Sequence, residues 1–348
     1  MLQRVLVPLD GSPLAESALP VAARIARMSG GQVILFRVYQ LSPNTSLPEA
    51  VVSAYDSDER EASGYLDAIA ARSEFAGIMV EQHVFGGETA MSILNATVEY
   101  KADLVVMTSH GRSGLTRWVM GSVAEHVVRH ALVPVFVLRG PGGNVVQPKR
   151  VCGADWRVLV TLDGSELAES AIEPARLLLD ALRAYEGGEL LLLRLVKPLG
   201  VTDDETAAST ALSHVSLEEM HTYVLHYAAE YMAKIARATQ ARAEDVPVRW
   251  AVAEARNVAE GIMRDADAPA RLEWHAADGS PHPLTQDREP GVSFIAMATH
   301  GHGGLQRWTL GSVAEHTLEA TALPLLLVRP EQPEEPKGPI ELVDVTRA

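Results

Sequence analysis

The sequence of 348 residues contains one cysteine and no long apolar run. Because Cys152 has no second cysteine to join, an internal disulfide is excluded, and nothing in the sequence asks for an oxidising compartment. No stretch approaches the ~20 uninterrupted apolar residues that a membrane span requires. The first strand-like run begins at Leu2, which leaves no room for a secretory signal peptide. We therefore expect a cytoplasmic protein with no membrane partner.

Positive charge and aromatic side chains are also scarce. Lys and Arg number 30 against 45 Asp and Glu, so the formal net charge is −15. A field of this sign repels nucleic-acid backbones at long range, and DNA and RNA are not expected as partners. Aromatic residues make up 5% of the chain and hydrophobic residues 47%. This aliphatic bias favours parallel strands and helices over a β-sandwich, and the length predicts about two domains.

The chain contains an internal duplication. RVLVPLDGSPLAESALPVAARIAR at Arg4–Arg27 matches RVLVTLDGSELAESAIEPARLLLD at Arg157–Asp180, at an offset of 153 residues. HGRSGLTRWVMGSVAEH at His110–His126 matches HGHGGLQRWTLGSVAEH at His300–His316, at an offset of 190 residues. A repeat of about half the chain length indicates two copies of one domain, and the second copy has gained 37 residues between the two motifs.

The predicted units are residues 1–140 and 156–330, joined by a linker at 141–155. The linker interrupts every periodic pattern, and the acidic, proline-rich tail at 331–348 is expected to be disordered. Of the extra residues in the second copy, 22 enter near 268–291, a stretch rich in Pro, Asp, Gly and His. This insertion is expected to form a loop.

Short apolar runs alternate with helical patterns in each half. The runs are Val5–Leu9, Val33–Val38, Val80–Phe85, Leu104–Thr108 and Val133–Leu138 in the first half, and Val158–Leu162, Leu190–Leu195, Val248–Ala253, Phe294–Ala298 and Leu323–Val328 in the second. Consecutive apolar positions are typical of strands buried on both faces, and one helix is expected at Pro13–Met28. The alternation predicts an α/β fold of two similar doubly wound domains, each a five-stranded parallel sheet of order 3-2-1-4-5 flanked by helices.

Ligands of open parallel sheets bind at the carboxyl ends of the strands, where the strand order reverses. The first strand ends in Pro8-Leu9-Asp10-Gly11-Ser12-Pro13, and its copy ends in Thr161-Leu162-Asp163-Gly164-Ser165-Glu166. Ser12 suits a helix N-cap with Pro13 at the first helical position. Two interpretations of Asp10 and Asp163 stay open. Each carboxylate either caps its own turn or accepts hydrogen bonds from the ribose or base of a nucleotide.

The fourth strand is followed by a glycine-rich segment that ends at a predicted helix start. Thr108-Ser109-His110-Gly111 is followed nine residues later by Gly121-Ser122, and Ser122-Val123-Ala124-Glu125 has the form of a capping box. A helix N-terminus preceded by glycine favours an anion, and Gly111 and Gly114 allow close approach of the backbone. Arg112 and Arg117 either add positive charge or pack as structural residues. The segment lacks the Gly-Lys-Ser/Thr of a Walker A loop and the Rossmann glycine spacing.

These residues resemble the universal stress protein family, as a tandem member with one copy at Met1–Arg139 and another at Arg157–Pro330. The family pattern is Gly, two residues, Gly, nine residues, then Gly and Ser or Thr. Gly111 and Gly301 match the second glycine, and Gly121-Ser122 and Gly311-Ser312 match the closing pair. Thr108 and Ala298 stand where the family has its first glycine.

The resemblance implies an ATP site in each half. Asp10 and Asp163 would lie near the ribose or adenine, Val38 and Leu195 would line the adenine, and the glycines and serines would hold the phosphates. The full sets are Pro8, Asp10, Val38, Met107, Thr108, His110, Gly111, Arg112, Gly114, Gly121, Ser122 and Val123, and Thr161, Asp163, Leu195, Met297, Ala298, His300, Gly301, Gly304, Gly311, Ser312 and Val313. For His110 and His300 a buried, backbone-bonded histidine is the favoured alternative. Any Mg²⁺ would be carried by the ATP phosphates, because no metal site of the protein's own is expected.

The leading functional hypothesis is a nucleotide-binding protein with a regulatory role in stress response. No catalytic residues are expected, because the sequence shows neither Ser–His–Asp spacing, nor a cysteine nucleophile, nor an HExxH helix. A slow ATP hydrolase and a scaffold with vestigial sites are the alternatives. The apolar fifth strands need covering, so the two halves are expected to pair within the chain. A homodimer and an unidentified regulatory protein are further expected partners, and the first half is expected to keep the less obstructed site.

Overall fold

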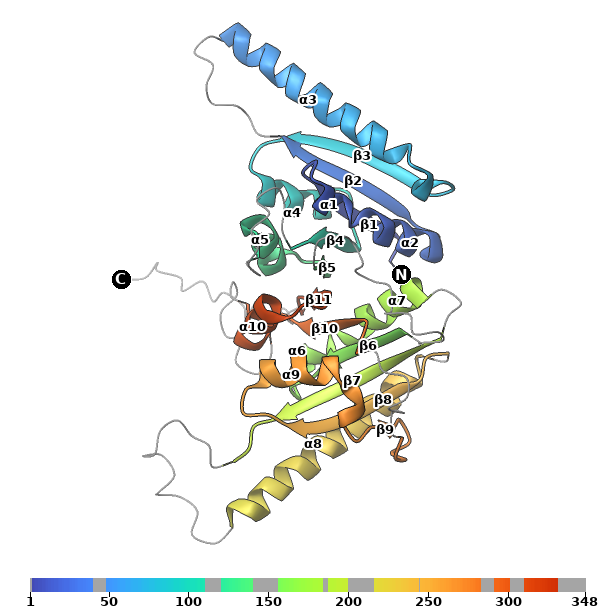
Figure 1. Cartoon of the computed structure of the whole chain (residues 1–348), viewed down its shortest axis with the longest axis vertical. Helices are drawn as coiled ribbons and strands as arrows, with labels where there is room; N and C mark the ends of the chain where they lie inside the picture. The colour runs from blue at the N-terminus through green and yellow to red at the C-terminus, as the bar shows by residue number, and fades with distance from the viewer. Residues whose placement is uncertain are drawn as a thin grey trace, which may run out of the picture.

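The computed structural model describes residues 2–39, 48–109, 120–139, 156–183, 187–199, 216–243, 245–282, 291–300 and 310–330. The predicted linker, the predicted tail and the glycine-rich segments at 110–119 and 301–309 lie outside these ranges. Within them the strands form one eleven-stranded sheet of order β3-β2-β1-β4-β5-β11-β10-β6-β7-β8-β9. The two halves of the chain lie end to end along the long axis of the molecule (Figure 1).

The first half contributes five strands to this sheet. Its elements are β1 (Arg4–Leu9), α1 (Pro13–Glu16), α2 (Leu19–Ser29), β2 (Gln32–Tyr39), α3 (Pro48–Ala70), a 3₁₀ turn at Ser73–Phe75, β3 (Met79–Gly86), α4 (Thr89–Glu99), β4 (Leu104–Thr108), α5 (Ser122–His130) and β5 (Val135–Leu138). The order β3-β2-β1-β4-β5 and the parallel pairing confirm the predicted fold.

The second half repeats this order as β8-β7-β6-β10-β11. Its elements are β6 (Trp156–Thr161), α6 (Glu166–Glu169), α7 (Ile172–Arg183), β7 (Gly188–Val196), α8 (Leu217–Gln240), β8 (Val248–Glu254), α9 (Val258–Asp267), a 3₁₀ turn at Pro269–Arg271, β9 (His275–Ala276), β10 (Phe294–Ala298), α10 (Ser312–Ala320) and β11 (Leu325–Val328). The long helices α3 and α8 lie at opposite ends of the molecule (Figure 1).

The expectation that the insertion is only a loop is wrong for its described part. Residues His275 and Ala276 form β9, which pairs antiparallel with Trp250 and Arg249 of β8. The Trp250 indole stacks on the His275 ring at a centroid distance of 4.6 Å, and its N–H donates to the Ala276 carbonyl. The insertion therefore adds a sixth strand to this half and covers the edge of β8.

The single helix predicted at Pro13–Met28 is also wrong, because the structure has two helices there. Helix α1 ends at Glu16 and α2 begins at Leu19. Pro20 lies in the first turn of α2 and has no N–H to donate to a carbonyl one turn earlier. Proline explains a smaller difference as well. Strands β5 and β11 begin just after Pro134 and Pro324, two residues later than predicted.

Apolar side chains alternate between the two faces of the sheet and build two cores. On β1, Val5 and Val7 join the core beneath α2, α3, α7 and α8, whereas Leu6 joins the core beneath α4, α5, α9 and α10. Both cores run without interruption from one half to the other. The molecule thus has three layers, and the halves share both hydrophobic interiors.

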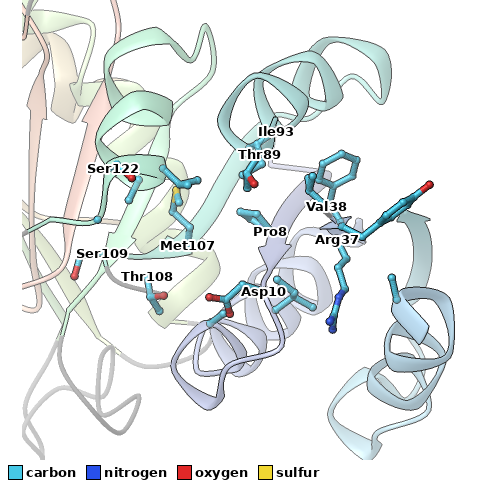
Figure 2. Close-up of a pocket in the computed structure, with 18 of the residues that line it drawn as sticks. Pro8, Asp10, Arg37, Val38, Thr89, Ile93, Met107, Thr108, Ser109 and Ser122 are labelled. Carbon is cyan, nitrogen blue, oxygen red and sulfur yellow. The ribbon is translucent and has the colours of Figure 1, made fainter. Parts of the chain in front are cut away.

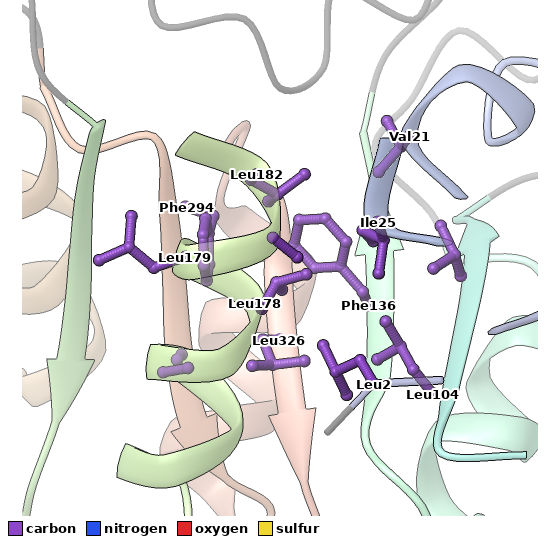
Figure 3. Packing of buried hydrophobic residues seen from close by; sticks show 14 of the residues in the cluster. Leu2, Val21, Ile25, Leu104, Phe136, Leu178, Leu179, Leu182, Phe294 and Leu326 are labelled. Atoms are coloured by element: carbon purple, nitrogen blue, oxygen red, sulfur yellow. The ribbon is translucent and has the colours of Figure 1, made fainter. Parts of the chain in front are cut away.

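Strands β5 and β11 join the halves by antiparallel pairing, as expected for two apolar edges. Phe136 pairs with Leu326, and the Phe136 ring meets Phe294 of β10 edge to face, with centroids 5.2 Å apart. Helix α2 packs against α7 above this junction (Figure 3). On the other face, the Arg129 guanidinium of α5 binds Glu315 of α10 at 2.6 Å.

Truncation of Phe136 should lower the stability of both halves together, because its ring is fully buried at their junction. We expect Phe136→Ala to lower the free energy of unfolding by ~3–5 kcal/mol in urea denaturation. Leu132→Ala is the matched control, since the Leu132 side chain is 68% exposed and its loss should change stability by less than ~0.5 kcal/mol. Equal losses for the two variants would contradict the assignment of the junction.

Candidate functional site

Each half has a cavity at the carboxyl ends of its strands. The first has a volume of about 620 Å³ and the second of about 430 Å³. The ends of the first, second and fourth strands and the N-terminus of the following helix line both cavities. Figure 2 shows Pro8, Val38, Met107 and Ser122 around the first cavity, with Asp10 below them. The cavities lie where the strand order reverses, as the sequence predicted.

The two predicted residue sets gather around these cavities wherever the structure describes them. The first cavity is lined by Pro8, Asp10, Val38, Met107, Thr108, Gly121, Ser122 and Val123. The second is lined by Thr161, Asp163, Leu195, Met297, Ala298, His300, Gly311, Ser312 and Val313. His110, Gly111, Arg112, Gly114, Gly301 and Gly304 lie outside the described residues. Residues far apart in the sequence thus converge on one place in each half.

The aspartates stand at the turns that start α1 and α6. Asp10 Oδ1 accepts a hydrogen bond from the Ser12 N–H at 2.8 Å, and Asp163 Oδ1 accepts bonds from the Ser165 N–H and hydroxyl. Ser12 in turn caps α1 by accepting from Ala15 N, as predicted. The turn interpretation of both aspartates therefore holds. It does not preclude a ligand, because a carboxylate has about four acceptor positions and both aspartates line a cavity.

Opposite each aspartate lies a helix N-terminus whose cap is glycine. Gly121 has the extended backbone of an N-cap, and its N–H donates to the Ser109 carbonyl at 2.8 Å. Gly311 donates to the Thr299 carbonyl at the same distance. The first N–H groups of α5 and α10 have no carbonyl of their own helix to bind, and the helix dipole adds positive potential there. This arrangement favours an anion at the end of each cavity.

The predicted capping box at Ser122 is wrong. Gly121 takes the N-cap position, so Ser122 is the first helical residue and its side chain makes no capping bond. Ser312 stands in the same position on α10. A capping box requires Ser at the N-cap and Glu three residues later, and here the frame is shifted by one residue. Both serines instead line the cavities, where a hydroxyl can contact a ligand.

Sequence reasoning missed the contribution of the third strand's helix and of α3. Thr89 and Ile93 of α4 line the first cavity, and Val258 and Ile262 of α9 line the second. These helices start at the N-caps Glu88 and Asn257, directly after the third strand of each half, so the strand-end rule could have found them. Arg37 and Tyr39 flank Val38 at the end of β2, so the same rule could have found them. Asp58 and Glu61 reach the first cavity from α3, for which the sequence had no such signal.

The expectation of a less obstructed first cavity agrees with the volumes of the two cavities. The insertion of the second half pairs through β9 with Trp250 and Arg249, near the amino end of β8. The second cavity lies at the opposite, carboxyl ends of the strands. The described part of the insertion therefore does not narrow it. His300 lines the second cavity and is half-buried. The Nδ1 atom of His300 lies 2.9 Å from the hydroxyl oxygen of Thr299.

Comparison with known proteins identifies the domain that is repeated. The family model described as the universal stress protein family matches residues 1–139 and 157–329. The chain belongs to the universal stress protein family. A universal stress protein of Methanocaldococcus jannaschii is 30% identical over 146 residues, covering 40% of this chain and 84% of that relative.

Tandem relatives match nearly the whole chain. A universal stress protein of Mycobacterium tuberculosis strain H37Rv is 24% identical over 353 residues, covering 95% of this chain and 97% of that protein. The crystal structure of a universal stress protein from Archaeoglobus fulgidus superposes with a TM-score of 0.61 at 20% identity, over 94% of this chain and 99% of that one. The last comparison shows the fold alone, and it supports the arrangement of two universal stress protein domains in one chain.

Within the described ranges, no helix combines the length and the apolar character that crossing a membrane demands. Among the same residues, no three His, Cys, Asp or Glu side chains are grouped to hold a metal ion.

The two kinds of serine at helix starts should differ in what they contribute to stability. Ser12→Ala removes a true N-cap bond and should lower the free energy of unfolding by about 1 kcal/mol. Ser122→Ala removes a first-turn hydroxyl without a capping bond and should change it by less than ~0.5 kcal/mol. Urea denaturation of both variants measures the difference. If Ser122→Ala lost more free energy of unfolding than Ser12→Ala, Ser122 would be a capping residue after all.

The N-cap carboxylate of α4 should make stability depend on pH. The N–H groups of Met91 and Ala90 donate to Glu88 and hold the pKa of its carboxyl below the ordinary 4.5. A lowered pKa means that the stabilisation is present above pH 4.5 and is lost as the pH falls through the folded-state pKa. At pH 7 the wild-type protein should therefore unfold at a higher urea midpoint than Glu88→Gln. Near pH 3 the two midpoints should become equal. A difference that persists at acid pH would contradict this.

Proposed function

We propose that this universal stress protein binds an adenine nucleotide in each half and acts as a regulatory protein of the stress response. The observation that carries the proposal is the repetition of one arrangement. In both halves a carboxylate on the first-strand turn and a glycine-capped helix N-terminus line a single cavity. A nucleotide carries both matching groups, since its ribose hydroxyls donate hydrogen bonds and its phosphates are anions.

The chemistry of the first cavity supports three contacts. Val38, Ile93 and Met107 form an apolar wall suited to a base, Asp10 is placed to accept bonds from ribose hydroxyls, and the α5 N-terminus with Ser122 suits phosphate. The second cavity offers the same three groups, an apolar side chain, a carboxylate and a hydroxyl at a helix N-terminus, from Leu195, Asp163 and Ser312. Volumes of about 620 and 430 Å³ lie within the range of small-molecule sites.

The acidic net charge does not oppose this assignment. A net charge of −15 acts at long range and is screened over roughly 8–10 Å at physiological salt. A helix N-terminus acts at contact distance through N–H groups that point at the ligand. The glycine-rich segments at 110–119 and 301–309 are proposed to complete the phosphate sites, and any Mg²⁺ would arrive bound to the phosphates. Thr108 and Ala298 are small enough to leave the strand ends open.

Isothermal titration of the intact protein with ATP tests the proposal. We expect saturable binding that falls by about 10-fold or more per site in Asp10→Ala plus Asp163→Ala, because each carboxylate would lose its bonds to ribose. Glu59→Ala plus Glu319→Ala is the matched control, since these exposed carboxylates lie outside both cavities. Absence of ATP binding by the wild-type protein would refute the proposed function.

A further inference from the structure

One network of three side chains occurs in both halves and joins three separate elements. The Arg37 guanidinium of β2 lies over the Tyr65 ring of α3, 4.4 Å from its centroid, and the Tyr65 hydroxyl donates to Glu16 of α1 at 2.9 Å. In the second half the Arg194 guanidinium of β7 lies 5.1 Å from the centroid of the Tyr231 ring of α8. The Tyr231 hydroxyl donates to Glu169 of α6, again at 2.9 Å.

The repetition is not a simple consequence of the duplicated sequence. The equivalent glutamates are 153 positions apart, the arginines 157 and the tyrosines 166. Insertions have therefore shifted the three positions relative to one another, yet the folded chain reassembles the same contacts. In both halves the three elements therefore meet at the same place.

That place is the turn that carries the cavity aspartate. Helices α1 and α6 are single turns that begin directly after Asp10-Gly11-Ser12 and Asp163-Gly164-Ser165 and end at Glu16 and Glu169. In the second half the guanidinium of Arg194 lies against the turn itself. A Cβ added to Gly164 would stand 2.8 Å from Arg194 Nη2, and Gly164 has a φ of +93°. The Arg194 guanidinium therefore lies between Gly164 of the turn and the ring of Tyr231.

The charges around Tyr231 agree with this geometry. Burial raises the pKa of the Tyr231 hydroxyl, the carboxylates of Glu169 and Asp163 raise it further, and the Arg194 guanidinium opposes them. The hydroxyl thus keeps its proton and donates a hydrogen bond to Glu169. Asp163 and Arg194 thus both act on the same phenol, with opposite effects on its pKa.

The two arginines differ in their relation to the cavities. Arg37 lines the first cavity together with Asp10, and both lie in the lower part of Figure 2. Arg194 is not among the described residues that line the second cavity. A direct contact with a ligand is therefore open to Arg37, whereas Arg194 has to act through the turn.

We propose that Arg37 and Arg194 are positioning residues of the nucleotide sites. Arg194 holds the Asp-Gly-Ser turn against Tyr231 of the long helix, so that the carboxylate of Asp163 faces the ribose hydroxyls. Arg37 is given the same role toward Asp10, because it makes the same contact with Tyr65, whose hydroxyl binds Glu16 at the end of α1. The inference rests on the proposed function and deepens it. It also ties α3 and α8 to the occupancy of the sites, because the tyrosines belong to those helices.

The test compares ATP with 2′,3′-dideoxy-ATP by isothermal titration. In a protein carrying Asp10→Ala the first site has no carboxylate for the ribose, so a preference for ATP over the dideoxy analogue reports the second site. That preference is expected to be about 10- to 100-fold. Arg194→Lys keeps the charge but loses the flat guanidinium that packs between Gly164 and Tyr231. We expect this change to reduce the preference for ATP to less than about threefold. The affinity for ATP should fall, while the affinity for the dideoxy analogue should stay unaltered.

Arg176→Lys is the matched control, because Arg176 of α7 binds Glu173 and Asp180 outside the cavity. Arg176→Lys alters these ion pairs on α7, but the ribose preference should keep its parental value. Should Arg194→Lys fail to fold, Tyr231→Phe replaces it, since it keeps the ring and removes only the bond to Glu169. A preference within twofold of the parent in the folded variant would overturn the inference alone. Failure of the parent to bind ATP would overturn the proposed function with it.

Discussion

The antiparallel pairing of β5 with β11 is the contact on which the rest of the molecule depends. Each strand is the edge of a five-stranded sheet and is apolar on both faces. Left unpaired, such an edge exposes both backbone groups and hydrophobic side chains. Their pairing satisfies the backbone and merges two sheets into one. It also allows both hydrophobic cores to continue from one domain into the other, through Phe136 and Phe294 on one face.

Because this junction is formed by the fifth strands, the cavities of both domains stay clear of it. The cavities lie at the reversal between the first and fourth strands of each domain, and long helices lie beyond the second and third strands. Each domain therefore keeps its own site while sharing its interior with the other. The two sites differ in their walls. The first has acidic groups from α3, Asp58 and Glu61, and the second has no α8 residue among its described lining.

Much of the fold and of the site could be predicted from the sequence, because the decisive signals are local. Consecutive aliphatic residues mark buried strands, and Leu104–Thr108 and Phe294–Ala298 coincide with β4 and β10. Glycine and serine after a strand mark a helix start, even though the frame of the cap was wrong by one residue at Ser122. The split between α1 and α2 was missed because the apolar pattern continues across it, while one missing N–H at Pro20 ends the hydrogen-bond ladder.

The sequence by itself determined that the chain is two copies of one α/β domain and which residues stand at the strand ends, since repeats, periodicity and turn residues are properties of neighbouring positions. Only the tertiary structure decided that Arg37 and Arg194 reach a tyrosine on a distant helix, and that β9 covers the edge of β8. Such contacts join residues separated by loops of different length. Their formation depends on how helices settle on the sheet, and no local pattern records that.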